Sequence, residues 1–211
     1  MNAKHWFANS QLNSLYKIPV VLLGGVAIAL VQMPLTLAES VWETSQTAQM
    51  VQGTPRSAQE YFERGRVRLR KADYQSAIED FNEAIRQNPN VAGGYFFRGI
   101  ARAQLDDYPG ALDDLNQAIR LDPEKPGVYV VRGATHLELE NYQEAIDDSN
   151  QALSLDPDLA LAFFTRGRAR VRVGETQAAM ADLRRAADLA QQEENDKLYR
   201  DVREVMAALQ Q

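Results

Sequence analysis

An Arg-Gly pair recurs four times in this sequence, and each copy lies 34 residues after the previous one. The pairs are Arg64-Gly65, Arg98-Gly99, Arg132-Gly133 and Arg166-Gly167. Alanines and prolines repeat at the same interval, at Ala77, Ala111, Ala145, Ala179, Ala84, Ala118, Ala152, Ala186, Pro89, Pro123 and Pro157. A fixed period of about 20 to 50 residues is typical of chains in which one small structural unit stacks on copies of itself. The period therefore predicts an array of stacked repeats.

Each repeat has the pattern of two helices joined by a short turn. In the first repeat, Tyr61, Gly65 and Leu69 share one face of a first predicted helix, and Ala77 and Phe81 share one face of a second. The segments NPN, DPE and DPD end the second helices, because proline cannot continue a helix. Glycine within a helix costs about 1 kcal/mol relative to alanine. Its recurrence therefore indicates a place where two helices approach closely.

These blocks resemble the tetratricopeptide repeat family. The second block carries the family's ordered pattern of aromatic, small, tyrosine and alanine residues and a closing proline, at Tyr95, Gly99, Tyr108, Ala111, Ala118 and Pro123. Ser149 and Thr176 depart from the pattern in the third and fourth blocks. The resemblance implies an all-α fold, a right-handed α-solenoid of four helical hairpins over residues 58–91, 92–125, 126–159 and 160–193.

The end of the chain, residues 194–211, has the pattern of a capping helix. One stripe of this segment is apolar and the opposite side is charged, the stripe being Leu198, Val202, Val205, Met206 and Leu209. We expect this helix to cover the last apolar face of the array.

The N-terminal segment, residues 1–38, differs in character from the repeats. Lys4 and Lys17 are its only charged residues, and a short apolar run follows them. This pattern predicts a secretory signal peptide cleaved near Ala38. An uncleaved membrane anchor over residues 18–37 is the alternative, because about 20 apolar residues can span a bilayer. Either interpretation predicts that the remainder is extracytoplasmic, in a periplasm, a lumen or the medium.

Residues 39–57 are rich in Gln, Ser and Thr and show no sustained apolar period. This composition predicts a flexible linker between the N-terminal segment and the repeats. A lone tryptophan in it, Trp42, is assigned no role.

Composition excludes several functions. Without cysteine, the chain has no disulfides, thiolate nucleophile or Cys-ligated zinc. The net charge is -6, and the part after residue 38 is more acidic still, which argues against a nucleic-acid partner. His5 lies in the N-terminal segment and His136 replaces an arginine of the repeat, so neither suggests catalysis. No phosphate loop or acid/base pair is recognisable. We therefore expect a protein that is not an enzyme and uses no cofactor and no metal.

Repeats of this family generally bind peptides or partner proteins in a groove lined by the first helix of each hairpin. Beside the packing face of those helices runs a stripe that is apolar in the middle and cationic toward both ends. Its members, the predicted groove residues, are Phe62, Arg66, Phe96, Phe97, Ile100, Val130, Val131, Phe164 and Arg168. We expect the set to form a partly exposed groove, although any single Phe or Val could instead pack against the neighbouring hairpin.

Charge is also divided between the two kinds of helix, with arginines on the first helices and acidic residues on the second. A basic inner wall favours an acidic ligand with apolar anchors. The arginines at the 34-residue period, however, are matched by aspartates at the same period, at Asp80, Asp114, Asp148 and Asp182. We expect those arginines to pair between helices, which leaves Arg66 and Arg168 for ligand contact.

The family's best-known ligand mode, a clamp of polar residues around a C-terminal carboxylate, is not supported. Where the resemblance places the clamp, this chain has Phe62, Arg66, Phe97, Gly127 and Val131. The sequence thus favours a protein-binding adaptor or scaffold of the cell envelope that holds an apolar or amphipathic, acidic segment of a partner. The alternative is a structural array that self-associates into a homo-oligomer near a membrane. The first repeat could offer a free end face for this, because no helical cap precedes it.

Overall fold

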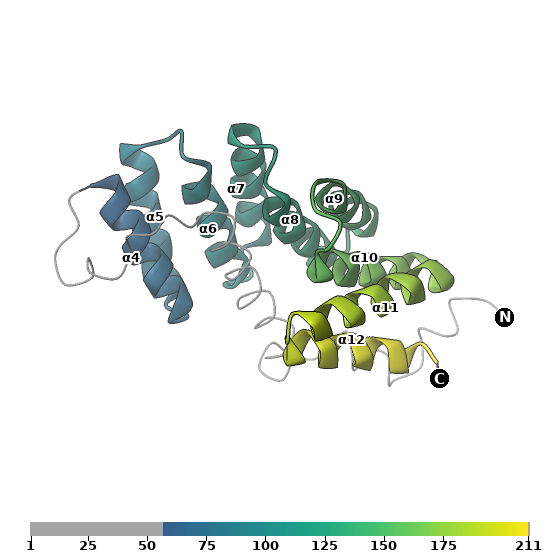
Figure 1. Ribbon diagram of the computed structural model, residues 1–211. Helices are drawn as coiled ribbons and strands as arrows, with labels where there is room; N and C mark the ends of the chain where they lie inside the picture. Colours follow the sequence, from purple (N-terminus) through teal and green to yellow (C-terminus); the bar gives the residue numbers. More distant parts are fainter. Residues whose placement is uncertain (1–56, 211) are drawn as a thin grey trace.

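The computed structural model describes residues 57–210, and every regular element in that range is a helix (Figure 1). Four hairpins follow one another: α4 (Ala58–Arg70) with α5 (Tyr74–Gln87), α6 (Ala92–Ala103) with α7 (Tyr108–Leu121), α8 (Pro126–Glu138) with α9 (Tyr142–Leu155), and α10 (Ala160–Val173) with α11 (Thr176–Gln192). A last helix, α12 (Asp196–Ala208), completes the chain order. The predicted all-α solenoid of four hairpins and a final helix is confirmed. The predicted N-terminal segment, 1–38, and most of the predicted linker lie outside the described residues.

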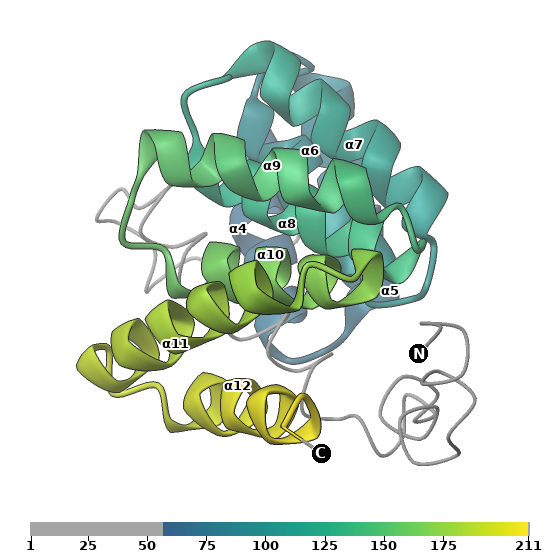
Figure 2. The same cartoon turned by 90° about the vertical axis from the view of Figure 1, so that its right-hand side faces the viewer.

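The hairpins lie side by side, with α4 at one end and α12 at the other (Figure 1). Their axes turn progressively along the array, which Figure 2 shows from the α11 and α12 side. Apolar side chains of neighbouring hairpins share two large clusters, one around Phe81 and Phe97 and one around Leu183 and Leu198. Each hairpin therefore depends on its neighbours for burial, as expected for a solenoid.

The recurring glycine marks the crossing of the two helices within a hairpin. A Cβ atom built on Gly99 would lie 3.1 Å from Leu115 Cγ and 3.3 Å from the backbone oxygen of Ala111. On Gly65 it would lie 2.7 Å from the ring of Phe81. The structure thus confirms that the glycine allows a close approach, which explains why its propensity cost is tolerated.

The turn within each hairpin has a left-handed residue, at Ala72, Asp106, Glu140 or Gly174, with φ of 59°, 61°, 61° and 87°. The residue that follows it serves both helices. The backbone N–H of Asp107 donates to the oxygen of Arg102 at 3.0 Å, and its carboxylate accepts from the N–H of Gly110 at 3.0 Å. One aspartate thereby closes α6 and begins α7.

The last helix covers the end of the array. Leu198, Val202 and Met206 are buried in the cluster that contains Leu183, while Val205 and Leu209 are partly buried against it. The side chain of Asn195 caps α12 by accepting from the N–H of Leu198 at 3.0 Å. The predicted apolar stripe is therefore the packing face of α12.

Candidate functional site

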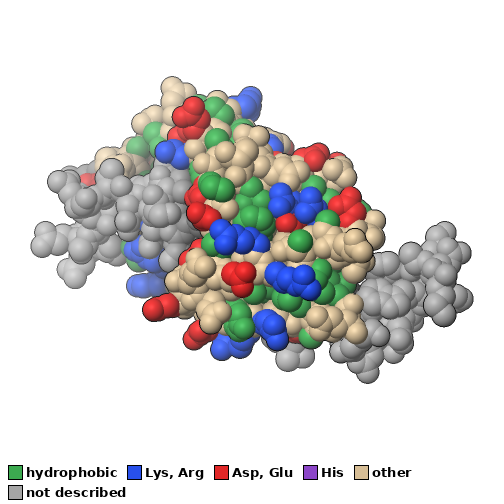
Figure 3. Space-filling view, turned by 45° about the vertical axis from the view of Figure 1, so that its right-hand side comes forward, with side chains coloured by type: hydrophobic (Ala, Val, Ile, Leu, Met, Phe, Trp, Pro, Cys, Tyr) green, Lys and Arg blue, Asp and Glu red, His purple; other side chains and the backbone are tan. Residues whose placement is uncertain are grey.

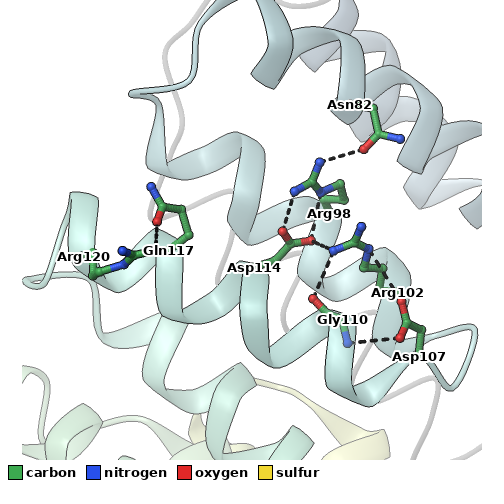
Figure 4. Close-up of polar contacts among 8 residues, drawn as sticks. All are labelled: Asn82, Arg98, Arg102, Asp107, Gly110, Asp114, Gln117 and Arg120. Carbon is green, nitrogen blue, oxygen red and sulfur yellow. Dashed lines mark hydrogen bonds and ion pairs between the residues drawn. The ribbon is translucent and has the colours of Figure 1, made fainter.

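A ladder of ion pairs joins the two helices of every hairpin. In the second hairpin, Arg98 Nη2 lies 2.6 Å from Asp114 Oδ1, and Arg98 Nε donates to Asp114 Oδ2 at 2.9 Å (Figure 4). The same two-point contact recurs between Arg64 and Asp80, Arg132 and Asp148, and Arg166 and Asp182. These aspartates are buried and the arginines are partly exposed, so each pair is a part-buried structural contact. The predicted pairing between helices is confirmed.

The same arginine also links one hairpin to the hairpin before it. Arg98 Nη1 donates to Asn82 Oδ1 at 2.7 Å, and Asn82 belongs to α5 (Figure 4). Arg132 and Arg166 make the same contact with Asn116 and Asn150, again at 2.7 Å. Each of these guanidinium groups therefore fixes both the geometry within its hairpin and the register to its neighbour.

A second arginine, one helical turn later, contacts the same aspartate in three hairpins. Arg68, Arg102 and Arg170 lie within 2.9 Å, 2.8 Å and 2.7 Å of Asp80, Asp114 and Asp182. His136 takes this place in the third hairpin, and its ring lies 3.4 Å from the side-chain nitrogen of Asn141. Burial lowers the pKa of His136, while the nearby Asp148 opposes that shift. The arginine at this position has a structural role in the first, second and fourth hairpins.

The predicted groove residues are more buried than the sequence suggested. Six of them are buried apolar side chains: Phe96, Phe97, Ile100, Val130, Val131 and Phe164. Phe97 packs between Phe62 and Phe81, at ring-centroid distances of 5.6 Å and 6.0 Å. Phe62 itself is only partly buried. The expectation of a partly exposed apolar groove is therefore wrong for these six side chains, because helices of neighbouring hairpins pack on this stripe, as Phe81 of α5 does on Phe97. Whether any of the set binds a partner stays a prediction.

Arg66, at the α4 end of the stripe, is also buried, at 5% exposed. Its Nη1 atom lies 3.1 Å from Oε2 of Glu63, which is buried beside it. The guanidinium lies 5.5 Å from the centroid of the Phe97 ring and 6.0 Å from that of Phe62. Sequence reasoning missed Glu63 as the partner of this arginine, since both lie outside the periodic ladders.

Arg168, at the other end of the stripe, is partly exposed. Its Nη2 atom lies 3.4 Å from Oε1 of Glu138, and its guanidinium lies 5.7 Å from the ring of Phe164. One turn along α10, Arg172 lies 3.5 Å from Glu140 and 4.8 Å from the ring of Tyr142. These long contacts to exposed carboxylates are weaker than the ladder contacts. On α10, Arg168 and Arg172 therefore differ from Arg166 and Arg170, which contact the buried carboxylate of Asp182 at 2.7 Å.

Basic and hydrophobic side chains lie next to one another on the face shown in Figure 3. The large apolar side chains that are exposed within residues 57–210 are Val91, Leu105, Leu155 and Val173, all at or near helix ends. Outside the predicted groove, an open hollow of about 440 Å³ lies beside α12, lined by Gln191, Glu194, Asp196 and Tyr199. None of these features provides a set of convergent catalytic groups.

Searches for other kinds of site gave negative results over the same range. The described residues contain no group of three or more His, Asp or Glu side chains that could hold a metal ion. None of the helices described there is both long and apolar enough to cross a bilayer.

Sequence reasoning also missed the asparagines Asn82, Asn116 and Asn150. They repeat at the 34-residue period, so the signal that found the aspartates could have found them as well. Their partner, the next hairpin's arginine, could be assigned only once the stacking of hairpins was known.

The geometry defines a class of protein, an all-α solenoid in which polar ladders join successive helical hairpins. The sequence matches the tetratricopeptide repeat family twice, over residues 62–126 and 133–210. These two matches take in most of the described residues, so the chain is a tetratricopeptide repeat protein. No curated protein matches it significantly.

Solved structures with a similar fold include three of particular interest. MamA is 20% identical with a TM-score of 0.60, and the match covers 65% of this chain and 81% of that one. The tetratricopeptide repeat domain of Arabidopsis OM64 is 27% identical with a TM-score of 0.54, covering 55% and 96%. The TPR2B domain of yeast Sti1, solved in a complex with pHsp70, is 25% identical with a TM-score of 0.53, covering 55% and 97%.

Proposed function

We propose that this protein is a non-enzymatic adaptor that binds an acidic, amphipathic segment of a partner protein on the first-helix side of the array. The observation that carries this proposal is the basic pair Arg168 and Arg172 on α10, whose Nη2 atoms lie 3.4 Å and 3.5 Å from the exposed carboxylates of Glu138 and Glu140. A ligand carboxylate could replace those contacts, because they are long and solvent-exposed. The yeast Sti1 domain, which was solved with pHsp70, supports peptide binding as a use of this fold.

The ring of Tyr142 supplies an apolar part of the surface. The guanidinium group of Arg172 lies 4.8 Å from the centroid of this partly buried ring, so a bound segment would meet charge and ring edge together. The guanidinium group of Arg168 lies over the buried ring of Phe164. The buried side chains Phe96, Val130 and Phe164 support this surface from below and are not proposed as direct contacts. The proposed ligand therefore has acidic residues beside one or two apolar anchors.

Selection of peptides from a displayed random library against the full chain tests this proposal. We expect enriched peptides to be acidic with apolar anchors, and their Kd to rise by about tenfold with Arg168→Glu. Arg185→Glu is the control, because Arg185 is an exposed arginine that is also paired with a carboxylate, that of Asp158, but lies on α11. Peptides whose affinity is the same for both variants would refute the proposed surface.

We also propose an extracytoplasmic location, in the cell envelope, supported by the two lysines and apolar run that precede the repeats. Fractionation of cells and N-terminal sequencing of the recovered protein test this. A new N-terminus near Ala38 in an extracytoplasmic fraction is expected for a signal peptide, and an intact N-terminus in the membrane fraction for an anchor. Recovery of the intact chain from the cytoplasm would refute both.

The alternative function is a self-associating structural array. Light scattering over a hundredfold range of concentration separates the two functions. An adaptor stays monomeric over that range, whereas a structural array grows in mass with concentration.

A further inference from the structure

The buried core of the array divides into two parts at α8. The cluster around Phe81 draws its buried members from α4 to α7 and also contains Val131 of α8. The cluster around Leu183 contains the adjacent residue Val130 and otherwise draws its buried members from the chain after α8. Among the described helices, α8 alone contributes buried residues to both clusters. The core is therefore split next to the junction between the second and third hairpins.

The junction between the third and fourth hairpins is held by charge. Three described ion pairs cross it, and each joins an arginine of the fourth hairpin to a carboxylate of the third repeat. They are Arg168 with Glu138, Arg172 with Glu140 and Arg185 with Asp158, at 3.4 Å, 3.5 Å and 2.7 Å. The first two lie near the turns within the hairpins, and the third lies at the connection between the hairpins. Contacts at both edges restrict the rotation of one hairpin against the other.

The junction between the first and second hairpins is held by aromatic rings. The ring centroid of Phe97 on α6 lies 6.0 Å from that of Phe81 on α5 and 5.6 Å from that of Phe62 on α4. Such ring pairs add to the free energy gained by burial. At the next junction, Leu115 and Val131 take the positions of Phe81 and Phe97, so this stack of rings is not repeated there.

The junction between the second and third hairpins also lacks the charge pairs. One period before the three ion pairs, the equivalent positions hold no opposite charges. These positions are Ala134 with Gln104, Glu138 with Asp106, and Gln151 with Glu124. The second combination places two carboxylates where the next junction has an arginine and a glutamate. This junction is therefore the one with neither kind of restraint.

The two carboxylates lie near the same tyrosine at the turn edge, the edge that carries the turns within the hairpins. The hydroxyl of Tyr108 donates to Oδ1 of Asp106 at 2.9 Å. Burial raises the pKa of Tyr108, and its hydrogen bond to Asp106 and the charge of the nearby Glu138 raise it further. Because like charges repel, Glu138 and Asp106 favour separation of the two hairpins at this edge.

Two hydrogen bonds hold the same junction on the side away from the turn edge. Arg132 Nη1 donates to Asn116 Oδ1 at 2.7 Å, and the hydroxyl of Tyr129 donates to the backbone oxygen of Pro123 at 3.1 Å. Both bonds come from the first two turns of α8, the half next to the connection from α7. They can stay formed while the turn edge opens, so they provide a pivot.

We propose that the junction between α7 and α8 is a hinge, about which the first two hairpins swing against the rest of the described array by opening at the turn edge. Hinge motion of this kind needs a local junction that is weaker than the bodies on either side. The motion changes the spacing between α6 and α8, and so the width of the first-helix side of the array. The hinge is a property of the free chain and does not depend on a bound partner.

Spin labels on the full-length chain test the hinge. The chain has no cysteine, so labels can be attached to introduced cysteines alone. Four exposed residues occupy equivalent positions at the starts of the second helices, next to the turns: Gln75, Pro109, Gln143 and Gln177. Electron paramagnetic resonance gives the distance distribution for each neighbouring pair. Dilution with unlabelled chain removes distances between molecules.

The pair that spans the proposed hinge should show the broadest distribution. We expect Pro109→Cys with Gln143→Cys to give a distribution about twice as wide as Gln143→Cys with Gln177→Cys. Gln75→Cys with Pro109→Cys should be as narrow as the latter, because aromatic rings hold that junction. Equal widths at the three junctions, or the greatest width at another junction, would overturn the proposal.

A charge reversal tests the cause of the opening. Asp106→Lys places a cation opposite Glu138, as Arg172 lies opposite Glu140, and is expected to narrow the distribution of the hinge pair about twofold. Glu124→Lys is the matched control, because it makes the same change of charge at the same junction, at an exposed residue of the connection whose equivalent partner is the neutral Gln151. The control should leave the distribution broad. The same width in the two variants would overturn the proposal.

Discussion

At the scale of single residues, His136 is one position where the repeat departs from its own pattern. Because it replaces the second arginine, Asp148 has one arginine partner where the other described aspartates of the ladder have two. We expect His136→Arg to raise the free energy of unfolding by about 1 kcal/mol, by adding a charge-assisted hydrogen bond to a buried carboxylate. Urea denaturation at pH 7.5 measures it, and a variant no more stable than the parent would contradict the expectation.

The same histidine makes stability depend on pH. Burial lowers the pKa of His136 in the folded protein, so the unfolded chain binds the proton first as the pH falls. The charged and titratable neighbours Asp148, Arg132 and Glu144 are retained in a His136→Gln variant. We expect the parent to lose more stability than this variant as the pH falls from 7.5 through the ordinary histidine value of about 6.5. Parallel pH profiles of the denaturation midpoint would contradict it.

Asn116 tests the contact between hairpins. Arg132 Nη1 donates to its side-chain oxygen at 2.7 Å, and no other described contact joins these two side chains. Asn116→Ala is expected to lower the free energy of unfolding by about 1 kcal/mol. Gln151→Ala, at an exposed position of α9, is the control and should change it by less than about 0.5 kcal/mol. Equal losses in the two variants would show that the ladder contact adds nothing.

At the scale of elements, the left-handed residue of the turn affects the free-energy cost of connecting the two helices of a hairpin. Ala72 adopts φ of 59° where Gly174 occupies the equivalent position with φ of 87°. We expect Ala72→Gly to stabilise the protein and Gly174→Ala to destabilise it, each by about 1 kcal/mol, because only glycine adopts this region without strain. Chemical denaturation of both variants measures the pair, and shifts of the same sign would contradict the argument.

The helices could be predicted because the sequence pattern of the helical hairpin occurs four times. A helix end that is ambiguous in one block is fixed by Pro89, Pro123 or Pro157 in another. The structural effect of a residue that departs from the pattern in one block could not be checked against the other blocks. Ser149, which replaces an apolar residue, stays fully buried because its hydroxyl donates to the backbone oxygen of Ala145 at 2.7 Å. This hydrogen bond could not be predicted from the 34-residue pattern, because it occurs in one block only.

The candidate site could be predicted only in part, for a physical reason. The ion pairs of the ladder could be predicted because the arginines of the first helices and the aspartates of the second helices recur at the same 34-residue interval. Exposure of Phe96 or Val130 depends instead on how closely successive first helices pack, which the period does not fix. The structure therefore moves the candidate contacts from the middle of the stripe to Arg168 and its neighbour on α10.

At the scale of the whole molecule, α12 carries the end of the shared core. Leu198, Val202 and Met206 bury apolar surface against α11 and its neighbours. Ending the chain at Glu194 would expose that surface, at a cost of about 4 kcal/mol or more. We expect the shortened chain to melt earlier and to bind a dye specific for apolar surface. Unchanged melting would show that α12 is not a cap.

At each internal junction of the array, an asparagine of one hairpin contacts an arginine of the next hairpin. A block that carries both residues can follow any other block that carries both, including a copy of itself. Duplication of the gene segment that encodes one 34-residue repeat would therefore create a junction with the same asparagine–arginine contact. Deletion of one internal repeat would also leave a junction with this contact. The length of this array is thus easy for evolution to change at its internal junctions.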